Sequence, residues 1–552
     1  MTTAPGEHAN PFSDPDLAED QREFVAESTL SVGRDASLTL GTDTLIVLDE
    51  AFARREPLNC CGLFPRSKTT RAIPFFNILW AELSDFELTI HHAHPVSKNI
   101  VRVAFINYNI EKTDRALAAS WTERLLDRAY GASQRRKRIK VLVNPFGGKG
   151  SAPKWYMRDI EPIFAAARCE IDVERTQYNG HAVEIAENLD VNSWDVVACC
   201  SGDGVPHEVF NGLGKKKDAA QALADVAVVQ LPCGTGNAMS WNLNGTDSPS
   251  LAALCIVKGL KTPLDLVSIT QGDRRTLSFL SQSVGIIAES DLGTENLRWM
   301  GSARFTFGFL VRLVGKTTYP CDIALQLEND DKSIIKAAYR QERDSTGPSP
   351  SSRRPDPVHH HPHQHSNPAQ PAPHSAAGLP PLRHGTINDT LPSSPSWSAL
   401  SPYPHLGNFY AGNMSYMAAS TPIFPCALPS DGCLDLVTMD GTISRLSALR
   451  SFLAVETGRF MDGENVSYRK VAAYRIVPRG SGRPQAGRFG RWMGRWGVGG
   501  GSAGGARQGK EEGYISIDGE RVPFEGFQAE VHRGLGTVLS RSGKVYEGDM
   551  VH

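Results

Sequence analysis

The first part of the chain alternates hydrophobic and polar positions with a period of two, which is typical of half-buried strands. This alternation recurs in four segments, at residues 37–48, 72–83, 86–92 and 101–106. Residues 113–130 instead place leucines at helical spacing. We therefore predict a small β-rich module over residues 26–135. We also predict a disordered tail at residues 1–25, where the sequence is polar and has no period.

A second pattern begins near residue 139, where short apolar runs are each followed by a glycine-containing turn and a helix-like segment. Such repeats predict a parallel sheet, so we expect an α/β domain over residues 136–270. Beyond it, shorter and turn-rich runs predict an antiparallel, sandwich-like β-rich domain over residues 271–552. Two inserts, 343–396 and 480–510, are predicted to be disordered because neither composition can bury a core.

Composition narrows the classes of function. The 552 residues carry a formal net charge of −2, and no basic stripe is interleaved with aromatic residues, so we do not expect binding to nucleic acid. Ten cysteines without disulfide-like spacing and a polar N-terminus favour a reducing, cytoplasmic setting. No apolar run reaches the ~18 residues that would span a bilayer. A lipid substrate would therefore be met by peripheral association with an intracellular or plasma membrane.

Two local features leave alternatives open. The adjacent Cys60 and Cys61 lie near phenylalanines and could carry reversible acyl chains, or they could be ordinary buried thiols. The histidine tract at residues 359–365 could bind a transition metal, but a Pro-rich insert seldom builds a fixed ligand cage. We therefore expect this insert to be dispensable for activity.

Glycine-rich turns follow three predicted strands of the α/β domain. The first turn follows the apolar residues 141–143 and contains Asn144, Gly147, Gly148, Lys149 and Gly150. Its backbone N–H groups could form a nest for phosphate, and its lysine supplies a positive charge. It is not a P-loop, because Gly150 stands where that motif requires Ser or Thr.

The other two turns follow the next predicted strands. The second contains Ser201, Gly202, Asp203 and Gly204, and the third contains Gly234, Thr235, Gly236 and Asn237. Neither matches the dinucleotide-binding pattern G-x-G-x-x-G, and the sequence lacks the protein-kinase motifs. Because the carboxyl ends of parallel strands lie at one edge of a sheet, the three turns should converge on one crevice. The sequence therefore predicts a nucleotide site there.

Asp203 is the single carboxylate set between two of these glycines. Phosphoryl transfer needs a base on the attacking hydroxyl and a metal to neutralise the phosphates. An aspartate at this position suits either role. A third interpretation is that Asp203 only caps the helix that follows it.

Together, these blocks resemble the lipid kinases of the diacylglycerol kinase superfamily, and within it the sphingosine (long-chain base) kinases of fungal type. The resemblance covers about residues 139–300 and returns near the C-terminus. It rests on the three glycine turns and on three further blocks, which are residues 207–212, residues 278–304 and Ile517-Asp518-Gly519-Glu520. The fold that it implies is an α/β nucleotide-binding domain joined to a β-rich lipid-binding domain.

The resemblance also implies cofactors and roles. ATP and Mg²⁺ are implied, with Mg²⁺ carried mainly by the ATP phosphates and with Asp203 as the proton acceptor and one candidate metal ligand. Asp291 is implied to hold the lipid amine, and Ser201 to contact both nucleotide and substrate. Phosphate or nucleotide contacts are implied for the glycine turns and for Thr176, Glu295, Arg298, Arg304 and Glu520.

Charge supports a sphingoid base over other lipids. The ammonium of a sphingoid base lies beside its primary hydroxyl. A carboxylate at Asp291 would therefore select a sphingoid base over diacylglycerol, which has no amine. Asp291, Glu295 and Arg298 are spaced by four and three residues, so they would share one face if the segment is helical. The alternatives are a diacylglycerol or ceramide kinase, and a catalytically silent lipid-sensing scaffold.

Overall fold

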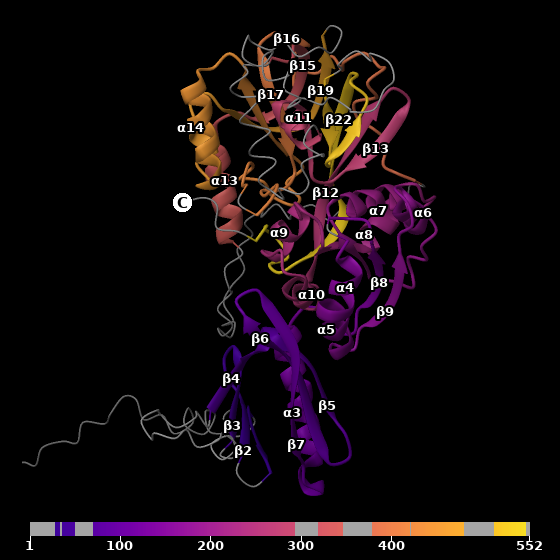
Figure 1. Cartoon of the computed structure of the whole chain (residues 1–552), viewed down its shortest axis with the longest axis vertical. Helices are drawn as coiled ribbons and strands as arrows, with labels where there is room; N and C mark the ends of the chain where they lie inside the picture. Colours follow the sequence, from indigo (N-terminus) through magenta and orange to yellow (C-terminus); the bar gives the residue numbers. More distant parts are fainter. Residues whose placement is uncertain are drawn as a thin grey trace, which may run out of the picture. The chain divides into compact units, whose positions relative to one another are not determined.

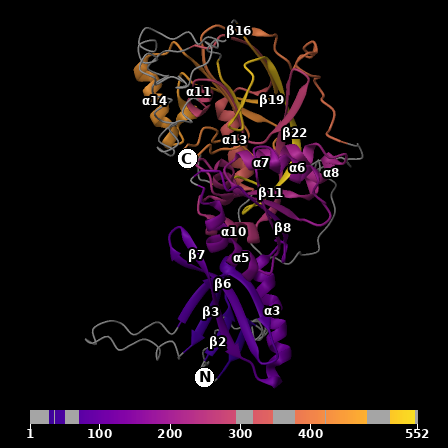
Figure 2. The same ribbon diagram turned by 45° about the vertical axis from the view of Figure 1, so that its right-hand side comes forward.

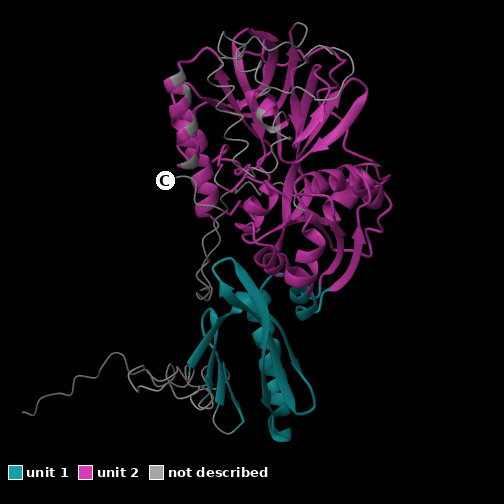
Figure 3. Cartoon of the chain, viewed as in Figure 1, with its two compact units in different colours: residues 1–136, 162–169 teal, residues 137–161, 170–552 magenta. Residues whose placement is uncertain are grey.

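The computed structural model describes most of the chain, namely residues 28–33, 36–49, 70–148, 150–292, 318–345, 378–419, 421–479 and 513–547. These residues form two compact units (Figure 3). Unit 1 comprises Met1–Arg136 with Pro162–Cys169, and unit 2 comprises Lys137–Glu161 with Glu170–His552. The predicted tail, the Cys60–Cys61 pair and the insert 480–510 lie outside the described residues.

Unit 1 contains two antiparallel sheets and a helix. The first sheet has the order β1 (Thr29–Val32), β2 (Ala36–Leu40), β3 (Thr44–Asp49) and β4 (Thr70–Pro74). The second has the order β5 (Ile78–Leu83), β6 (Glu87–Ser97) and β7 (Ile100–Asn109). Short 3₁₀ turns, η1 (Phe75–Asn77) and η2 (Lys112–Asp114), precede β5 and α3 (Arg115–Tyr130).

Helix α3 connects the two sheets of unit 1. Trp121 is fully buried and donates its ring N–H to the carbonyl of Ser28, one residue before β1, at 3.1 Å. Tyr130, the last residue of the helix, donates its hydroxyl to the carbonyl of Leu79 in β5 at 2.5 Å. The buried face of α3 and these two hydrogen bonds hold the sheets in one core.

The α/β part of unit 2 is built on a fully parallel sheet. Its strands in sequence are β8 (Arg138–Val143), β9 (Glu170–Arg175), β10 (Val196–Ser201) and β11 (Ala227–Pro232). Their order across the sheet is β9-β8-β10-β11, so the chain changes direction between β8 and β10. Ligands of open α/β sheets bind beyond the carboxyl ends of the strands at such a switch point.

Helices cover this parallel sheet (Figures 1 and 2). Every residue of β10 and β11 is buried, as expected of strands covered on both faces. The helical segments of this part of unit 2 are α4 (Ala152–Trp155), η3 (Tyr156–Ile160), α6 (His181–Glu187), α7 (Gly204–Gly214), α8 (Ala219–Asp225), α9 (Ala238–Asn244) and α10 (Pro249–Lys258). Helix α5 (Glu161–Ala166) belongs to unit 1 from Pro162 onward.

The β-rich part of unit 2 is one large antiparallel sheet that curls around its own core. Its main path is β13-β12-β22-β19-β18-β17-β14-β20-β21, and β15 joins at β19 and carries β16. Val267 of β12 and Ile515 of β20 belong to the same buried cluster although their strands are distant in this order. The predicted fold class, α/β with an antiparallel β-rich part, is confirmed.

The strands of this sheet have the following bounds: β12 (Leu260–Gln271), β13 (Arg274–Ser278), β14 (Ser281–Gly285), β15 (Cys321–Asn329), β16 (Ser401–Tyr403), β17 (Leu406–Gly412), β18 (Leu434–Asp440), β19 (Ser467–Pro478), β20 (Ile515–Ile517), β21 (Glu520–Val522) and β22 (Phe527–Ser540). The helical segments are α11 (Ile286–Leu292), α13 (Lys332–Asp344), α14 (Arg445–Glu456) and η5 (Phe460–Asp462).

The long pair β12 and β22 runs from the α/β part into the β-rich part (Figure 1). Its register breaks between Leu264 and Leu266. The buried Asp265 at this break accepts the backbone N–H groups of Gly432 and Gly534, each at 2.6 Å. The boundary predicted at residue 270 falls within β12, and both sides belong to one compact unit.

One predicted insert is partly ordered, which corrects the prediction of disorder over residues 343–396. Arg475 of β19 donates to the carbonyls of Thr386 and Asp389 at 2.9 and 2.7 Å. Gln528 of β22 donates to those of His384 and Gly385 at 3.1 and 2.9 Å. The backbone carbonyls of the segment accept hydrogen bonds from these side chains whatever its composition. The composition of the segment therefore does not predict that it is ordered. The histidine tract lies outside the described residues.

Candidate active site

The three glycine turns meet at the carboxyl edge of the parallel sheet. A Cβ atom on Gly234 would lie 2.4 Å from the Cα atom of Gly202, a distance that no side chain tolerates. A Cβ atom on Gly148 would lie 2.9 Å from the carbonyl oxygen of Cys233, and the φ angle of Gly148 is +58°. The turns after β8, β10 and β11 are therefore in backbone contact, and glycine is required where they touch.

The remaining residues of the first turn shape its loop. The side-chain oxygen of Asn144 accepts the N–H of Phe146 at 2.9 Å, and the N–H of Gly150 binds the carbonyl of Gly147 at 2.9 Å. The φ angle of Gly150 is +69°, which favours glycine. Lys149 lies outside the described residues.

Two hydroxyl residues predicted at the site lie at the ends of β9 and β10, the strands on either side of β8. Thr176 follows β9, is buried, and donates its backbone N–H to the carbonyl of Val143 at 3.0 Å. Ser201 ends β10, is buried, and donates its hydroxyl to the carbonyl of Gly202 at 2.7 Å. Both therefore lie on the same sheet edge as the glycine turns.

Asp203 is bound to the start of helix α9. Its two carboxylate oxygens accept the backbone N–H groups of Ala238 and Met239 at 3.1 and 3.0 Å. Its side chain makes no cap hydrogen bond to α7, the helix that follows it. This corrects the capping interpretation, because the helix end that Asp203 binds belongs to the third turn. Burial raises the pKa of Asp203, and these two N–H donors oppose that shift.

The third turn places the start of α9 beside Asp203. Asn237 adopts a left-handed conformation with a φ angle of +52°. Its amide group exchanges two hydrogen bonds with the backbone of Gly234, at 2.9 and 3.2 Å. Gly236 comes so close to Asp203 that an added Cβ atom would lie 3.3 Å from the carboxylate, whereas Thr235 is exposed to solvent.

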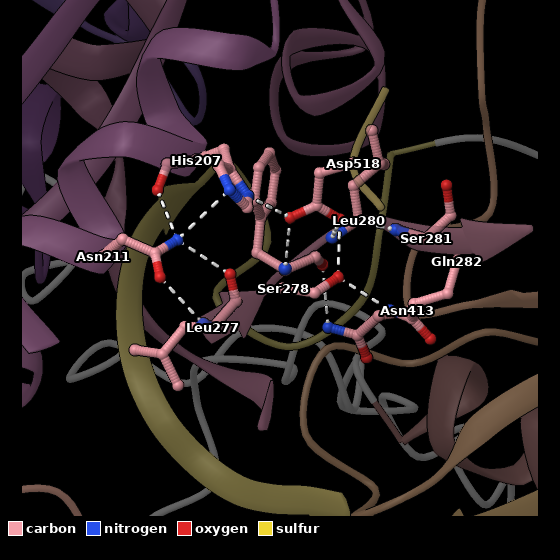
Figure 4. A network of polar contacts seen from close by, with 10 residues as sticks. His207, Asn211, Leu277, Ser278, Leu280, Ser281, Gln282, Asn413 and Asp518 are labelled. Atoms are coloured by element: carbon pink, nitrogen blue, oxygen red, sulfur yellow. Dashed lines mark hydrogen bonds and ion pairs between the residues drawn. The ribbon is translucent and has the colours of Figure 1, made fainter. Parts of the chain in front are cut away.

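A buried network around Asp518 joins the α/β part to the β-rich part of unit 2 (Figure 4). Asp518 has a φ angle of +51° and accepts the Ser278 hydroxyl and three backbone N–H groups of residues 279–281, at 2.6 to 3.0 Å. It also lies 2.8 Å from Nδ1 of His207 on α7. Burial raises the pKa of Asp518, but His207 and the other donors outweigh burial and lower it.

Asn211 continues this network along α7. Its amide nitrogen donates to the carbonyls of His207 and Leu277 at 2.9 and 2.8 Å, and its oxygen accepts the N–H of Leu277 at 2.8 Å (Figure 4). The motif blocks of the sequence contain His207, Asn211 and Asp518, but no role was predicted for these residues. The available signal was the spacing of His207 and Asn211 by four residues, which places them on one face of the helix.

A cavity of about 350 Å³ opens on this side of α7. Its lining includes His207, Glu208, Asn211 and Glu520. The Glu520 carboxylate lies 3.2 Å from the position that a Cβ atom on Gly204 would take, so it reaches the second glycine turn. Glu208 accepts the N–H of Ala182 at 3.1 Å. Burial raises the pKa of Glu208, and the negative charge of Glu520 adds to that shift.

Asp291, predicted to hold the lipid amine, and the predicted phosphate or nucleotide contacts that closely follow it in the sequence lie at or beyond the limit of the described chain. Asp291 is in the last turn of α11. This helix is anchored by the buried Ile286 and by a hydrogen bond of 3.2 Å, which the N–H of Ile287 donates to the side-chain oxygen of Asn408. Glu295, Arg298 and Arg304 lie outside the described residues. Within the described ranges, no three His, Cys, Asp or Glu side chains gather as a metal site would require.

Comparison with known proteins identifies two matched regions. Residues 138–269 match the family described as "Diacylglycerol kinase catalytic domain", and residues 28–131 match "Domain of unknown function (DUF7493)". A crystal structure of a diacylglycerol kinase from Bacillus anthracis str. Sterne aligns with 76% of this chain and 100% of its own, with a TM-score of 0.40 and 14% identity.

Curated relatives extend the match beyond the catalytic domain. Sphingoid long chain base kinase 5 of Saccharomyces cerevisiae is 33% identical over 77% of this chain, and the alignment spans 62% of that protein. Sphingoid long chain base kinase 4 of Schizosaccharomyces pombe is 32% identical over 85% of this chain and 88% of its own length. Human sphingosine kinase 1 is 28% identical over 73% of this chain and 90% of its own.

The matched catalytic domain and the converging glycine turns define a lipid kinase that uses ATP. The sequence similarity extends over most of the length of both yeast proteins, which narrows the class of lipid kinase. The chain belongs to the family of sphingoid long-chain base kinases, in agreement with the resemblance to the fungal type. None of the helices in the described ranges is both long and apolar enough to cross a membrane.

Proposed function

We propose that this protein transfers the γ-phosphoryl group of ATP to the primary hydroxyl of sphingoid long-chain bases such as sphinganine, phytosphingosine and sphingosine. The observation that carries the proposal is the contact between the three glycine turns around Asp203, which gives one carboxylate a fixed place beside a phosphate cradle. The yeast relatives named above support the sphingoid acceptor.

Asp203 serves as the proton acceptor in this scheme. The hydroxyl of the lipid loses its proton to the carboxylate as its oxygen bonds to phosphorus and ADP leaves. Burial raises the pKa of Asp203, which makes the carboxylate a stronger base than an exposed aspartate. The two N–H groups of α9 fix its orientation.

The phosphates are held by backbone N–H groups and by cations. Turns with left-handed glycines, such as the one at Gly148, can point backbone N–H groups toward an anion, whereas the N–H of Gly150 is already bound to the carbonyl of Gly147. Lys149, Arg298 and Arg304 would add positive charge against the phosphate oxygens in the transition state. Asn144, Thr176 and Ser201 lie on the same edge and complete the contacts.

The nucleotide base would occupy the cavity beside α7. Glu208 and Glu520 both line it, and carboxylates accept hydrogen bonds from the exocyclic amine of adenine or from ribose hydroxyls. The cavity of about 350 Å³ lies within the range of small-molecule sites. Glu520 also reaches the second glycine turn, so it would contact the nucleotide between its base and its phosphates.

Mg²⁺ fits a site of this kind. Magnesium commonly takes one or two carboxylates together with substrate phosphates, and Asp203 is the carboxylate available among the three turns. The ATP phosphates would carry most of the coordination of this ion, and Asp203 would be its ligand from the protein only if another group accepts the proton of the lipid. When bound, the ion would neutralise negative charge on the transferring phosphoryl group.

Asp291 would select the amine of the lipid. It lies near the end of α11, an element anchored by Ile286 and Asn408 in the β-rich part. A carboxylate there pairs with the ammonium of a sphingoid base and has no partner in diacylglycerol. Ser201 would contact the acceptor hydroxyl.

The test is a purified protein assay with labelled ATP. Sphinganine, phytosphingosine, sphingosine, diacylglycerol and ceramide are offered separately, and the labelled lipid products are separated. Phosphorylation confined to the amine-bearing lipids supports the proposal, and Asp291→Asn should then raise KM for these lipids. Preference for diacylglycerol or ceramide would identify another lipid kinase, and absence of turnover on every lipid would favour a silent scaffold.

A further inference from the structure

Helix α14 (Arg445–Glu456) carries hydrophobic side chains on the face that points away from the core. Leu446, Leu449 and Leu453 are 59%, 40% and 58% exposed, and their spacing by three and four residues puts them on one side of the helix. The buried Ser451 and Val455 lie on the opposite side. The water-facing side of such a helix normally carries polar residues, so this leucine face indicates a binding surface.

The start of α14 adjoins the element proposed to bind the lipid amine. Ile443, two residues before α14, packs against Ile286 and Tyr319. Ile286 begins α11, and the last turn of α11 contains Asp291. Figures 1 and 2 both show α14 at the outer edge of the β-rich part. The leucine face is thus an outer surface next to the proposed lipid site.

The charges around the leucine face suit an anionic bilayer. Arg450 is exposed and follows Leu446 by four residues, so it lies beside this face, and the exposed Arg459 comes shortly after the helix. Asp462 is paired with Lys336 at 2.5 Å, which offsets its negative charge. Leucines with flanking arginines are typical of helices that lie in the membrane interface, whereas protein interfaces favour aromatic residues.

We propose that the leucine face of Leu446, Leu449 and Leu453 docks onto the surface of a lipid bilayer. The helix would lie in the interface plane, with its leucines among the acyl chains and Arg450 at the headgroups. The proposal rests on the proposed function, because a sphingoid base resides in a membrane and each methylene of its chain resists transfer into water. Docking beside α11 would let the lipid reach the site with little exposure to water.

The test uses the full chain and a triple variant, Leu446→Gln/Leu449→Gln/Leu453→Gln. Flotation with vesicles of phosphatidylcholine and phosphatidylserine measures binding, which should fall about tenfold or more. Turnover of sphinganine presented in the same vesicles should fall by a similar factor. Turnover of a short-chain, water-soluble sphingoid base should stay within about twofold of the wild type, because its path to the site does not need the membrane.

Two further variants keep the test decisive. Met157→Gln/Val173→Gln changes residues that are 58% and 42% exposed on the α/β part, and it should leave flotation unchanged. Arg450→Glu keeps the leucines and should weaken binding to vesicles that contain phosphatidylserine more than to neutral ones. This variant remains informative if the triple variant fails to fold.

Three outcomes would overturn the proposal. The triple variant could float with vesicles as the wild type does, its turnover of the short-chain base could fall as far as that of vesicle-borne sphinganine, or the wild type could be a dimer that the triple substitution separates. The last result would identify an interface between two copies. Failure of the wild type to phosphorylate any sphingoid base would instead refute the proposed function, since flotation does not depend on turnover.

Discussion

The carboxylate of Asp518 lies 2.8 Å from Nδ1 of His207, a residue 311 positions earlier in the chain. This contact joins the turn between β20 and β21 to α7, the helix that starts directly after Asp203. Glu520, two residues beyond Asp518, is thereby held at the cavity beside α7. The ion pair therefore positions a proposed nucleotide contact from the far end of the chain.

Asp518→Asn should lower the free energy of unfolding by about 2–4 kcal/mol. The asparagine side chain has only one acceptor oxygen. Its nitrogen would face backbone N–H groups of residues 279–281, which now donate to the carboxylate. His207 would also lose its charged partner. Urea unfolding of the two proteins measures the difference.

The matched control for this change is Asp330→Asn. Asp330 is exposed, so the same substitution there should change the free energy of unfolding by less than about 0.5 kcal/mol. A loss as small as this at Asp518 would show that the buried network does not depend on its negative charge.

The same ion pair predicts a pH dependence of stability. Burial lowers the pKa of His207, but Asp518 outweighs burial and raises it above the ordinary value. A raised folded pKa contributes stability that is complete below the unfolded value of about 6.5 and is lost as the pH rises through the folded pKa. The lowered pKa of Asp518 acts in the opposite sense, so its contribution is lost as the pH falls through that lowered pKa.

The measurement is urea unfolding of the wild type and of His207→Gln across the pH range. The stability difference between them should be largest between about pH 4 and pH 6.5 and should shrink at higher pH. A difference that stays constant from about pH 4 to about pH 9 would mean that folding does not raise the pKa of His207.

Local patterns in the sequence predicted the parallel strands and the convergence of their glycine turns. Each strand of a parallel sheet is predicted from one apolar run. The glycines after β10 and β11 predict that these two turns converge, and the contact between Gly202 and Gly234 confirms it. The bond between Asp203 and α9 was missed, because pattern reasoning assigns a capping residue to the helix that follows it.

Long-range contacts limited what could be predicted. The pairing of His207 with Asp518 depends on how the curled sheet returns to α7, and no local period encodes it. The order of residues 383–389 depends in the same way on Arg475 and Gln528, whose hydrogen bonds reach across 89 and 143 residues of sequence. Composition indicates whether a segment can bury a core of its own. Residues 383–389 are held instead by polar groups of other strands, which composition does not reveal.

Gly234→Ala tests the contact between the turns. The added Cβ atom would lie 2.4 Å from the Cα atom of Gly202, so the second and third turns must move apart. We expect a loss of about 1–3 kcal/mol in the free energy of unfolding. A displacement of about 1 Å at a catalytic site can cost about a hundredfold in rate, so kcat/KM for ATP should also fall by about that factor.

Gly526→Ala is the control for that substitution. A Cβ atom on Gly526 would meet no atom closer than 3.5 Å, which is ordinary van der Waals contact. It should leave the stability within about 0.5 kcal/mol of the wild type and leave turnover unchanged. If Gly234→Ala behaved like this control, the turns would not need their close approach.

Asp203→Asn tests the proposed proton acceptor. The amide keeps the size of the side chain but binds a proton far more weakly, so turnover of sphinganine should fall by about 10²–10⁴-fold. Nucleotide affinity, measured by calorimetry, should change by less than about threefold, because the phosphate cradle is built from backbone N–H groups. Asp218→Asn, at an exposed residue before α8, should retain full turnover. Turnover within about tenfold of the wild type in Asp203→Asn would assign proton acceptance to another group.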